Sequence, residues 1–346
     1  MGLQPFVFAC GDESPAVISQ IVVDDIFGQC PRVDVPLNVP HRVETNDACI
    51  AEFAKQLSMF GAGAKMSTAT DHPDIKRLGL SSANIKLRKM AGVVGMIRMT
   101  HHPLNYDKPV IVLRYASGDY YNETGVELVE ENGVEFMDVT TRTNLSDLTP
   151  FAEMGIKLAR EHGFRLRASS KYTVSESERI FMDHITDVFH EHGLVEWTKD
   201  APGDYRKILT DLGLARIANE MDGGWCWLLG NANGDTGSDI AEIRDGSRSM
   251  GSTLFCRDGA FYEELPGGTA PDFLGCENWV KPDGTPFNPT GIILSIAAAV
   301  ERANPDHAQW IDSIRAATAT YITKTAPSDI RALEMIKYVA KSATEG

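Results

Sequence analysis

Two aspartates one helical turn apart are the first residues whose types and spacing could carry out chemistry. Asp235 and Asp239 lie in the stretch GNANGDTGSDIAE, where glycine and asparagine indicate a turn that leads into a helix. Residues i and i+4 of a helix share a face, so both carboxylates are expected to point the same way. Acids in the first turn of a helix also cap its free N–H groups, and the spacing alone favours that role. Capping and cation binding both stay open here.

A third aspartate, Asp211, falls within a helix predicted over Tyr205–Glu220. The apolar stripe of that helix consists of Ile208, Leu212 and Ala215. A carboxylate buried in such a stripe is costly without a cationic partner, so an ion pair with a nearby lysine or arginine is one interpretation. The other interpretation joins Asp211 to the first two aspartates as oxygen ligands of Mg²⁺ or Mn²⁺, completed by water and substrate oxygens.

Arginines supply the opposite charge. Arg114 ends the buried strand predicted for PVIVLRY, and Arg88 and Arg98 lie in SSANIKLRKMAGVVGMIRM. Singly, each is most often a solvated side chain or part of a structural ion pair. Ligands of α/β sheets, however, bind at the carboxyl ends of strands, and guanidinium groups bind carboxylates through two parallel hydrogen bonds. Three arginines therefore suit a polycarboxylate substrate.

The bulk composition is that of an acidic globular protein. Its 346 residues allow two domains, and the net charge of −15 argues against nonspecific binding to nucleic acid or anionic membranes. The six cysteines form no C-x-x-C pair, the N-terminus lacks the features of a signal peptide, and the longest apolar run, Gly291–Val300, is too short to span a bilayer. We expect a cytoplasmic protein with reduced thiols and no nucleic-acid or membrane partner.

The elements that must position these residues alternate between strand and helix. PFVFACGDESPAVISQIVVDDIF indicates a strand, a turn and a helix, and CIAEFAKQLSMFGAGAKMSTAT indicates a helix, a turn and a strand. This alternation predicts an α/β fold. The stretch GVELVEENGVEFMDVTTRTN instead indicates a β-hairpin around Asn132 and Gly133. Because an isolated hairpin is marginal in water, we expect it to pair with another element, such as a partner subunit.

Several segments follow one another in the order of a known family's motifs. The earlier ones are AKMSTAT, SSANIKLR, LRYASGDYY and SSKYT, with matching positions at Thr68, Thr70, Ser82, Asn84, Arg88, Arg114, Gly118, Asp119, Tyr121, Lys171 and Thr173. The later ones are GDTGSD, PGGTAPDF and NPTGIILS, which contain the two aspartates, a cofactor loop and Asn288. Their shared order over nearly the whole chain makes chance a poor explanation. The sequence resembles the β-decarboxylating dehydrogenases, specifically the isocitrate dehydrogenases of the eukaryotic type.

The resemblance implies an isocitrate/isopropylmalate dehydrogenase-like α/β fold with a large domain, a small domain and a short β clasp. The large domain would comprise 1–91 and 247–346, with the cofactor loop and the terminal helices. The small domain would comprise 92–118 and 146–246, with the metal site and the dimer interface. Residues 119–145 would form the clasp between subunits.

The resemblance also implies an activity, which is metal-dependent oxidative decarboxylation of isocitrate with hydride transfer to NAD. The implied substrate-binding residues are Thr70, Ser82, Asn84, Lys86, Arg88, Arg98 and Arg114. The implied cofactor-binding residues are Thr68, Gly267, Gly268, Thr269, Ala270, Asp272 and Asn288. Asp211, Asp235 and Asp239 would hold Mg²⁺ or Mn²⁺, with Lys171 as the base and Tyr121 as the acid. Lys171 and Asp211 would come from the second subunit, so that the site exists only in a homodimer.

The sequence departs from the family pattern at three places. Ala83 replaces the proline of the S-P-N motif, and one extra residue separates Arg88 from Arg98. Gly267 replaces a histidine of the cofactor loop, which removes a contact to adenosine. Asp272 lies where NADP-dependent eukaryotic relatives have a basic residue, so NAD is expected to be preferred over NADP.

Rival functions differ in what they ask of the site. A noncatalytic regulatory subunit would have lost acid, base or metal residues, whereas this chain keeps all of them. An isopropylmalate dehydrogenase would need leucines where this chain has Ser82 and Asn84. Lys86, at position i+4 from Ser82, shares its helix face and could bind a phosphonate analogue of isocitrate, phosphonomethylmalate. The simpler interpretation is that Lys86 is solvated or pairs with an acid such as Glu44.

Overall fold

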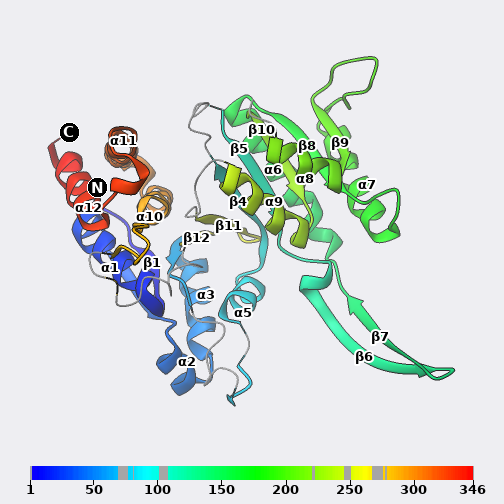
Figure 1. The fold of residues 1–346 in the computed structure, drawn as a ribbon, viewed down its shortest axis with the longest axis horizontal. Helices are drawn as coiled ribbons and strands as arrows, with labels where there is room; N and C mark the ends of the chain where they lie inside the picture. The colour runs from blue at the N-terminus through cyan, green and yellow to red at the C-terminus, as the bar shows by residue number, and fades with distance from the viewer. Residues whose placement is uncertain are drawn as a thin grey trace. The chain divides into compact units, whose positions relative to one another are not determined.

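A computed structural model of the protein describes residues 2–68, 77–80, 82–100, 108–219, 223–244, 251–266, 276 and 279–345. The chain divides into two compact units, unit 1 from Met1–Val93 with Ser249–Gly346 and unit 2 from Val94–Arg248. Unit 1 is thus built from both ends of the chain, and unit 2 from its middle, as the colours of Figure 1 show.

Unit 1 combines helices with strands that are mostly parallel. Its strands are β1 (Phe6–Cys10), β2 (Arg32–Pro36), β3 (Ala62–Lys65), β11 (Ser252–Cys256) and β12 (Phe261–Glu264). They run in the order β2-β1-β3-β12-β11, parallel except for β11. Its helices are α1 (Glu13–Phe27), α2 (Val39–Thr45), α3 (Ala48–Phe60), α5 (Ala83–Met90), α10 (Thr290–Ala303), α11 (Ala308–Lys324) and α12 (Ala332–Glu345).

The core of unit 1 brings the two ends of the chain together. Phe6 and Phe8 of β1 are fully buried in one cluster with Ile292 and Ile296 of α10. The side chain of Asn304, just after α10, donates to the Gln4 carbonyl oxygen over 3.1 Å. The apolar run over 291–300 is therefore a core helix, and no helix in the described ranges is long and apolar enough to cross a membrane.

Besides a hairpin, unit 2 holds five further strands and four α-helices among its described residues. The strands are β4 (Val93–Thr100), β5 (Val110–Tyr115), β8 (Arg165–Ser170), β9 (Tyr205–Leu209) and β10 (Trp225–Leu229), in the order β4-β5-β10-β8-β9. The helices are α6 (Leu148–His162), α7 (Glu176–Glu191), α8 (Thr210–Asn219) and α9 (Asn231–Arg244). Ile217 of α8 and Ala241 of α9 are buried against Val112 and Trp227 of the strands. This packing fixes α9 over the end of β5.

The predicted hairpin is confirmed. Strands β6 (Glu123–Glu131) and β7 (Val134–Thr141) pair antiparallel around Asn132 and Gly133, whose φ angles of 53° and 77° are those of the favoured two-residue turn. The hairpin extends away from the rest of unit 2 in Figure 1. Along one face, Val126 lies opposite Val139 and Leu128 opposite Met137, and all four side chains are exposed. The α/β fold with a two-stranded clasp is thereby confirmed as well.

The helix predicted over 205–220 is wrong in its first part. Tyr205–Leu209 forms β9, which pairs in parallel with β8, and only Thr210–Asn219 is helical. The helical spacing of Ile208 and Leu212 misled the prediction, because Ile208 is buried in a strand while Leu212 is half-exposed on α8. Backbone pairing with β8 decided the local structure, and a short apolar run does not reveal such pairing.

The turn predicted before Asp235 is also wrong, because α9 already begins at Asn231. Gly234 is needed there for close packing: a Cβ at this position would lie 2.7 Å from side-chain carbons of Arg114. The glycine therefore lets α9 approach β5 closely instead of breaking the helix.

Candidate active site

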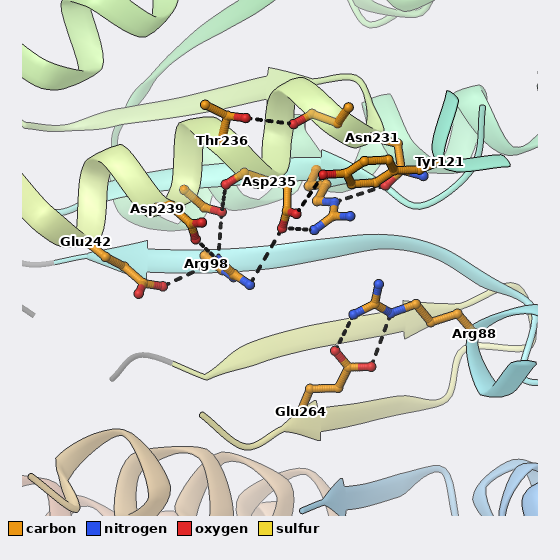
Figure 2. A network of polar contacts seen from close by, with 12 residues as sticks. Arg88, Arg98, Tyr121, Asn231, Asp235, Thr236, Asp239, Glu242 and Glu264 are labelled. Atoms are coloured by element: carbon orange, nitrogen blue, oxygen red, sulfur yellow. Dashed lines mark hydrogen bonds and ion pairs between the residues drawn. The ribbon is translucent and has the colours of Figure 1, made fainter. Parts of the chain in front are cut away.

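Asp235 and Asp239 project from the same side of α9, as the sequence predicted (Figure 2). Neither lies in the first turn of the helix, so the N-terminal capping alternative does not apply to them. The start of α9 is bound instead by Asp119, whose Oδ2 accepts a hydrogen bond of 2.7 Å from the Ala232 N–H. Both carboxylates are therefore available for other partners.

Arg98 of β4 lies beneath this face of α9 (Figure 2). Its guanidinium donates to Asp239 Oδ1 over 2.8 Å and to the Ser238 hydroxyl over 2.9 Å. Its Nη2 lies 4.0 Å from Asp235 Oδ1. The guanidinium therefore spans both aspartates, which demonstrates that the two carboxylates share a face.

Arg114 of β5 holds Asp235 from the other side. It donates to Asp235 and, over 3.0 Å, to the side-chain oxygen of Asn231. Its guanidinium carbon lies 5.5 Å from the centroid of the Tyr121 ring, within cation–π range. Arg114 is buried, so its charge is screened less than that of a surface arginine and acts strongly on these neighbours.

Tyr121 completes this network. Its hydroxyl donates to Asp235 Oδ2 over 3.3 Å, and its backbone N–H donates to Asp119 Oδ1 over 3.0 Å. Desolvation and the neighbouring Asp235 carboxylate raise the pKa of the Tyr121 phenol above its usual value. Tyr121 therefore carries its proton at neutral pH and can donate it.

Glu242 is a member of this cluster that the sequence reasoning missed. It lies three residues beyond Asp239 on α9, with Oε1 3.6 Å from Arg98 Nη1. Burial raises the pKa of Glu242 to about 7. Its spacing from Asp235 and Asp239, at i+7 and i+3 on the same helix face, is the signal that could have identified it.

A hard divalent cation fits this pair of aspartates. Mg²⁺ is commonly bound through one or two carboxylates, with water and substrate oxygens filling the other positions. Asp235 and Asp239 supply two such carboxylates, and Arg98 and Arg114 already balance part of their charge. Within the part of the chain that the structure describes, no group of three acidic, histidine or cysteine side chains could hold a metal. Asp211 therefore does not join the pair within one chain.

Lys171 and Asp211 pair with each other instead. Lys171 Nζ lies 2.7 Å from Asp211 Oδ1, and this hydrogen bond lowers the pKa of the Asp211 carboxyl. The side chain of Asp211 is 66% exposed, so the prediction that it lies in a buried stripe is wrong. The reason is the position of α8, which buries Gly213 and Ile217 and turns Asp211 outward. No described hydrogen bond or ion pair joins Lys171 or Asp211 to Asp235, Asp239 or Tyr121.

Helix α5 of unit 1 carries a second group of predicted substrate residues, of which Ser82 is its N-cap. The side-chain oxygen of Asn84 lies 3.3 Å from the Thr68 hydroxyl, which donates to it. Lys86 Nζ lies 2.5 Å from Asp47 Oδ2. The carboxylate of Asp47 also accepts from Arg42 over 2.8 Å. Lys86 thus forms the ion pair that the sequence considered, but with Asp47 rather than Glu44.

Arg88, further along α5, is held by an acid that the sequence reasoning missed. Its guanidinium binds both carboxylate oxygens of Glu264, over 2.5 and 3.2 Å (Figure 2). Beside them Lys65 is fully buried, which lowers the pKa of its ammonium to about 8. The contact between Arg88 and Glu264 shows that Arg88 can bind a carboxylate through two hydrogen bonds.

The predicted cofactor residues are only partly described. Asn288 accepts from the Thr290 N–H over 3.0 Å and from its hydroxyl over 2.6 Å at the start of α10. Thr70, Gly267, Gly268, Thr269, Ala270 and Asp272 lie outside the described residues.

Comparison with known proteins gives a consistent picture. The model of the family "Isocitrate/isopropylmalate dehydrogenase" matches residues 64–345. Among curated proteins, the mitochondrial NADP isocitrate dehydrogenase of Candida tropicalis is 24% identical over 75% of this chain and 69% of its own length. The peroxisomal NADP enzyme of the same organism is 26% identical, over 77% of this chain and 74% of its own length.

Two solved structures share the fold. The structure of isocitrate dehydrogenase from Ostreococcus tauri in complex with isocitrate and magnesium(II) has a TM-score of 0.79 and 19% identity, and the match covers 99% of each chain. A β-decarboxylating dehydrogenase from Thermococcus kodakarensis has a TM-score of 0.72 and 18% identity, over 99% of this chain and 97% of its own.

Proposed function

Because the chain belongs to the isocitrate/isopropylmalate dehydrogenase family, we propose that it oxidises and decarboxylates isocitrate, or a close 3-carboxy-2-hydroxy acid. The observation that carries this proposal is the network in which Asp235 binds both Arg114 and Tyr121 while Asp239 binds Arg98. Paired carboxylates for a cation, arginines for carboxylates and a protonated phenol are the groups that this reaction requires.

The residues of the chain have separate tasks in the proposed reaction. Arg98 and Arg114 bind and orient the substrate carboxylates, and Tyr121 protonates the carbon that loses CO₂. Lys171 accepts the proton of the substrate hydroxyl. The bound Mg²⁺ or Mn²⁺, held by Asp235 and Asp239, supplies Lewis acidity, and the nicotinamide cofactor supplies the hydride acceptor.

We propose further that the enzyme is a homodimer in which Lys171 and Asp211 of one subunit complete the site of the other. These two exposed residues pair with each other and have no described hydrogen bond or ion pair with Asp235, which supports this assignment. The exposed apolar face of the hairpin supports it too, because a partner chain would cover Val126, Leu128 and their neighbours. Cys10, Cys30, Cys49, Cys226 and Cys256 are free thiols, which agrees with the cytoplasmic location that we propose.

The proposed function is tested by a substrate panel. Purified protein with Mg²⁺ and NAD is expected to reduce the nicotinamide with isocitrate faster than with isopropylmalate or malate, and to release one CO₂ per NADH. Reduction of the cofactor without CO₂, or turnover of isopropylmalate alone, would contradict the proposal. Absence of turnover with every acid would favour the regulatory-subunit alternative.

NAD is expected to be preferred over NADP by at least about tenfold in kcat/KM, because the Asp272 carboxylate would repel a 2′-phosphate. The relatives named above are NADP enzymes, so the two cofactors must be compared directly. Asp272→Asn is expected to bring kcat/KM with NADP closer to kcat/KM with NAD, because it removes the repelling charge. A higher kcat/KM with NADP in the unchanged protein would refute the NAD assignment.

Lys86 decides between isocitrate and the runner-up substrate, phosphonomethylmalate. Because Asp47 already neutralises its ammonium, Lys86→Ala is expected to change kcat/KM for isocitrate by no more than about threefold. Lys89→Ala, on the same helix, is a matched control for loss of a surface charge. If Lys86→Ala instead lowered kcat/KM for the phosphonate at least tenfold more than for isocitrate, the phosphonate would become the favoured substrate.

A further inference from the structure

We propose that Glu242 is a positioning residue for Arg98. When Asp239 binds a divalent cation, Glu242 keeps the Arg98 guanidinium in the site. This inference rests on the proposed metal site at Asp235 and Asp239. It gives a role to a buried acid that takes no part in the proposed chemistry.

The contacts of Arg98 carry the inference. Its Nη1 lies 2.8 Å from Asp239 Oδ1 and 3.6 Å from Glu242 Oε1, so one guanidinium nitrogen faces two carboxylates (Figure 2). The contact to Asp239 is a hydrogen bond, whereas the contact to Glu242 is an ion pair beyond hydrogen-bond distance. A small movement of the guanidinium would replace the hydrogen bond to Asp239 by one to Glu242.

The environment of Glu242 favours a new hydrogen bond from Arg98. The side chain of Glu242 is 11% exposed, against 64% for the side chain of Asp239. Among the described residues, Glu242 Oε1 is a buried oxygen without a hydrogen bond. A buried carboxylate oxygen without a hydrogen bond is costly, so a donor that moves toward it is stabilised. Arg98 of β4, with Nη1 3.6 Å from this oxygen, is placed to be that donor.

Cation binding and the hydrogen bond to Arg98 compete for Asp239. A divalent cation and a guanidinium that share one carboxylate oxygen repel each other. Arg98 must then give up Asp239 Oδ1 to the cation. Asp235, whose Oδ1 lies 4.0 Å from Arg98 Nη2, belongs to the same proposed metal site and would be engaged by the cation as well. Glu242 supplies another acid, so Arg98 stays beside the site, where it can bind a substrate carboxylate.

The test measures Mn²⁺ binding to the substrate-free protein by electron paramagnetic resonance. Glu242→Gln is expected to raise the Kd for Mn²⁺ about tenfold, because the acids described beside Arg98 are then the two aspartates of the proposed metal site. Arg98→Met is expected to lower the Kd, since it frees Asp239. In the Arg98→Met background, Glu242→Gln is expected to change the Kd less than about threefold, the effect of a nearby charge alone. Glu242→Asp, which keeps the charge, is expected to recover at least half of the loss on a logarithmic scale.

The outcomes separate this inference from the proposed function. An equal effect of Glu242→Gln in both backgrounds would show that Glu242 acts only through its charge and would overturn the positioning role. An unchanged Kd in Arg98→Met would overturn the competition between Arg98 and the cation. If Asp239→Asn bound Mn²⁺ as tightly as the unchanged protein, the metal site itself, and with it the proposed mechanism, would be wrong. Thermal unfolding of each variant ensures that folded proteins are compared.

Discussion

Replacing Asp235 or Asp239 by asparagine is expected to lower kcat/KM for isocitrate by about a thousandfold or more. Asparagine keeps the size of the side chain but removes the negative charge that holds a divalent cation. Without the cation, the charge that develops as CO₂ leaves would be poorly stabilised. The measurement is steady-state kinetics at saturating Mg²⁺, together with the melting temperature of each variant.

The fold should survive these substitutions. The amide oxygen of asparagine can still accept from Arg114 at position 235 or from Arg98 at position 239, so Tm is expected to fall by no more than roughly 5 °C. Asp183→Asn is a matched control, because Asp183 is exposed on α7 and its ion pair within the described ranges is with Arg179 of the same helix. Near-normal activity of either site variant, or full activity of the unchanged protein in excess chelator, would refute the metal assignment.

The second large effect is the recovery of activity when two inactive variants are combined in one dimer. Asp235→Asn and Lys171→Met are each expected to be almost inactive alone. If Asp235 of one subunit and Lys171 of the other form one site, a mixed dimer contains one site with neither substitution. Equal amounts of the two chains should then recover about a quarter of the unchanged activity, since half of the dimers are mixed and each has one intact site of two.

A matched control exists for this complementation. Asp235→Asn mixed with Asp239→Asn should recover nothing, because both residues come from the same α9 and every mixed site carries one defect. The chains must be coexpressed or refolded together so that subunits exchange, and the mixed dimer isolated through two different affinity tags. Absence of recovery in an isolated mixed dimer would place Lys171 and Asp235 in the same subunit and refute the shared site.

Local geometry explains which parts of the site the sequence could predict. The common face of Asp235 and Asp239 follows from a four-residue spacing in a helix, and the hairpin turn follows from Asn132-Gly133. The position of Arg114 at the end of an apolar run likewise follows from the pattern of β5. Each of these features depends on residues close together in the chain, so sequence reasoning found them.

Features set by distant pairing escaped prediction. The boundary between β9 and α8 depends on β8, which the spacing of Ile208 and Leu212 does not report. The spacing of Glu242 places it on the same face as Asp235 and Asp239, but its contact with Arg98 depends on a strand far earlier in the chain. Lys86 binds Asp47, which lies in the turn between α2 and α3 with a left-handed φ of 64°, rather than Glu44. No local pattern encodes these tertiary contacts.

The construction of unit 1 from both ends of the chain has a consequence for synthesis on the ribosome. Every strand of unit 2 has been made before α10, α11 and α12 leave the exit tunnel, whereas β1 is made earlier and the cluster that buries Phe6 and Phe8 includes residues of those helices. The nascent chain must therefore carry an incompletely covered apolar strand for most of its elongation, during which chaperones that bind extended apolar segments would have a target. A chain stopped before α10 would keep that strand exposed, and would be a preferred substrate for quality-control proteases.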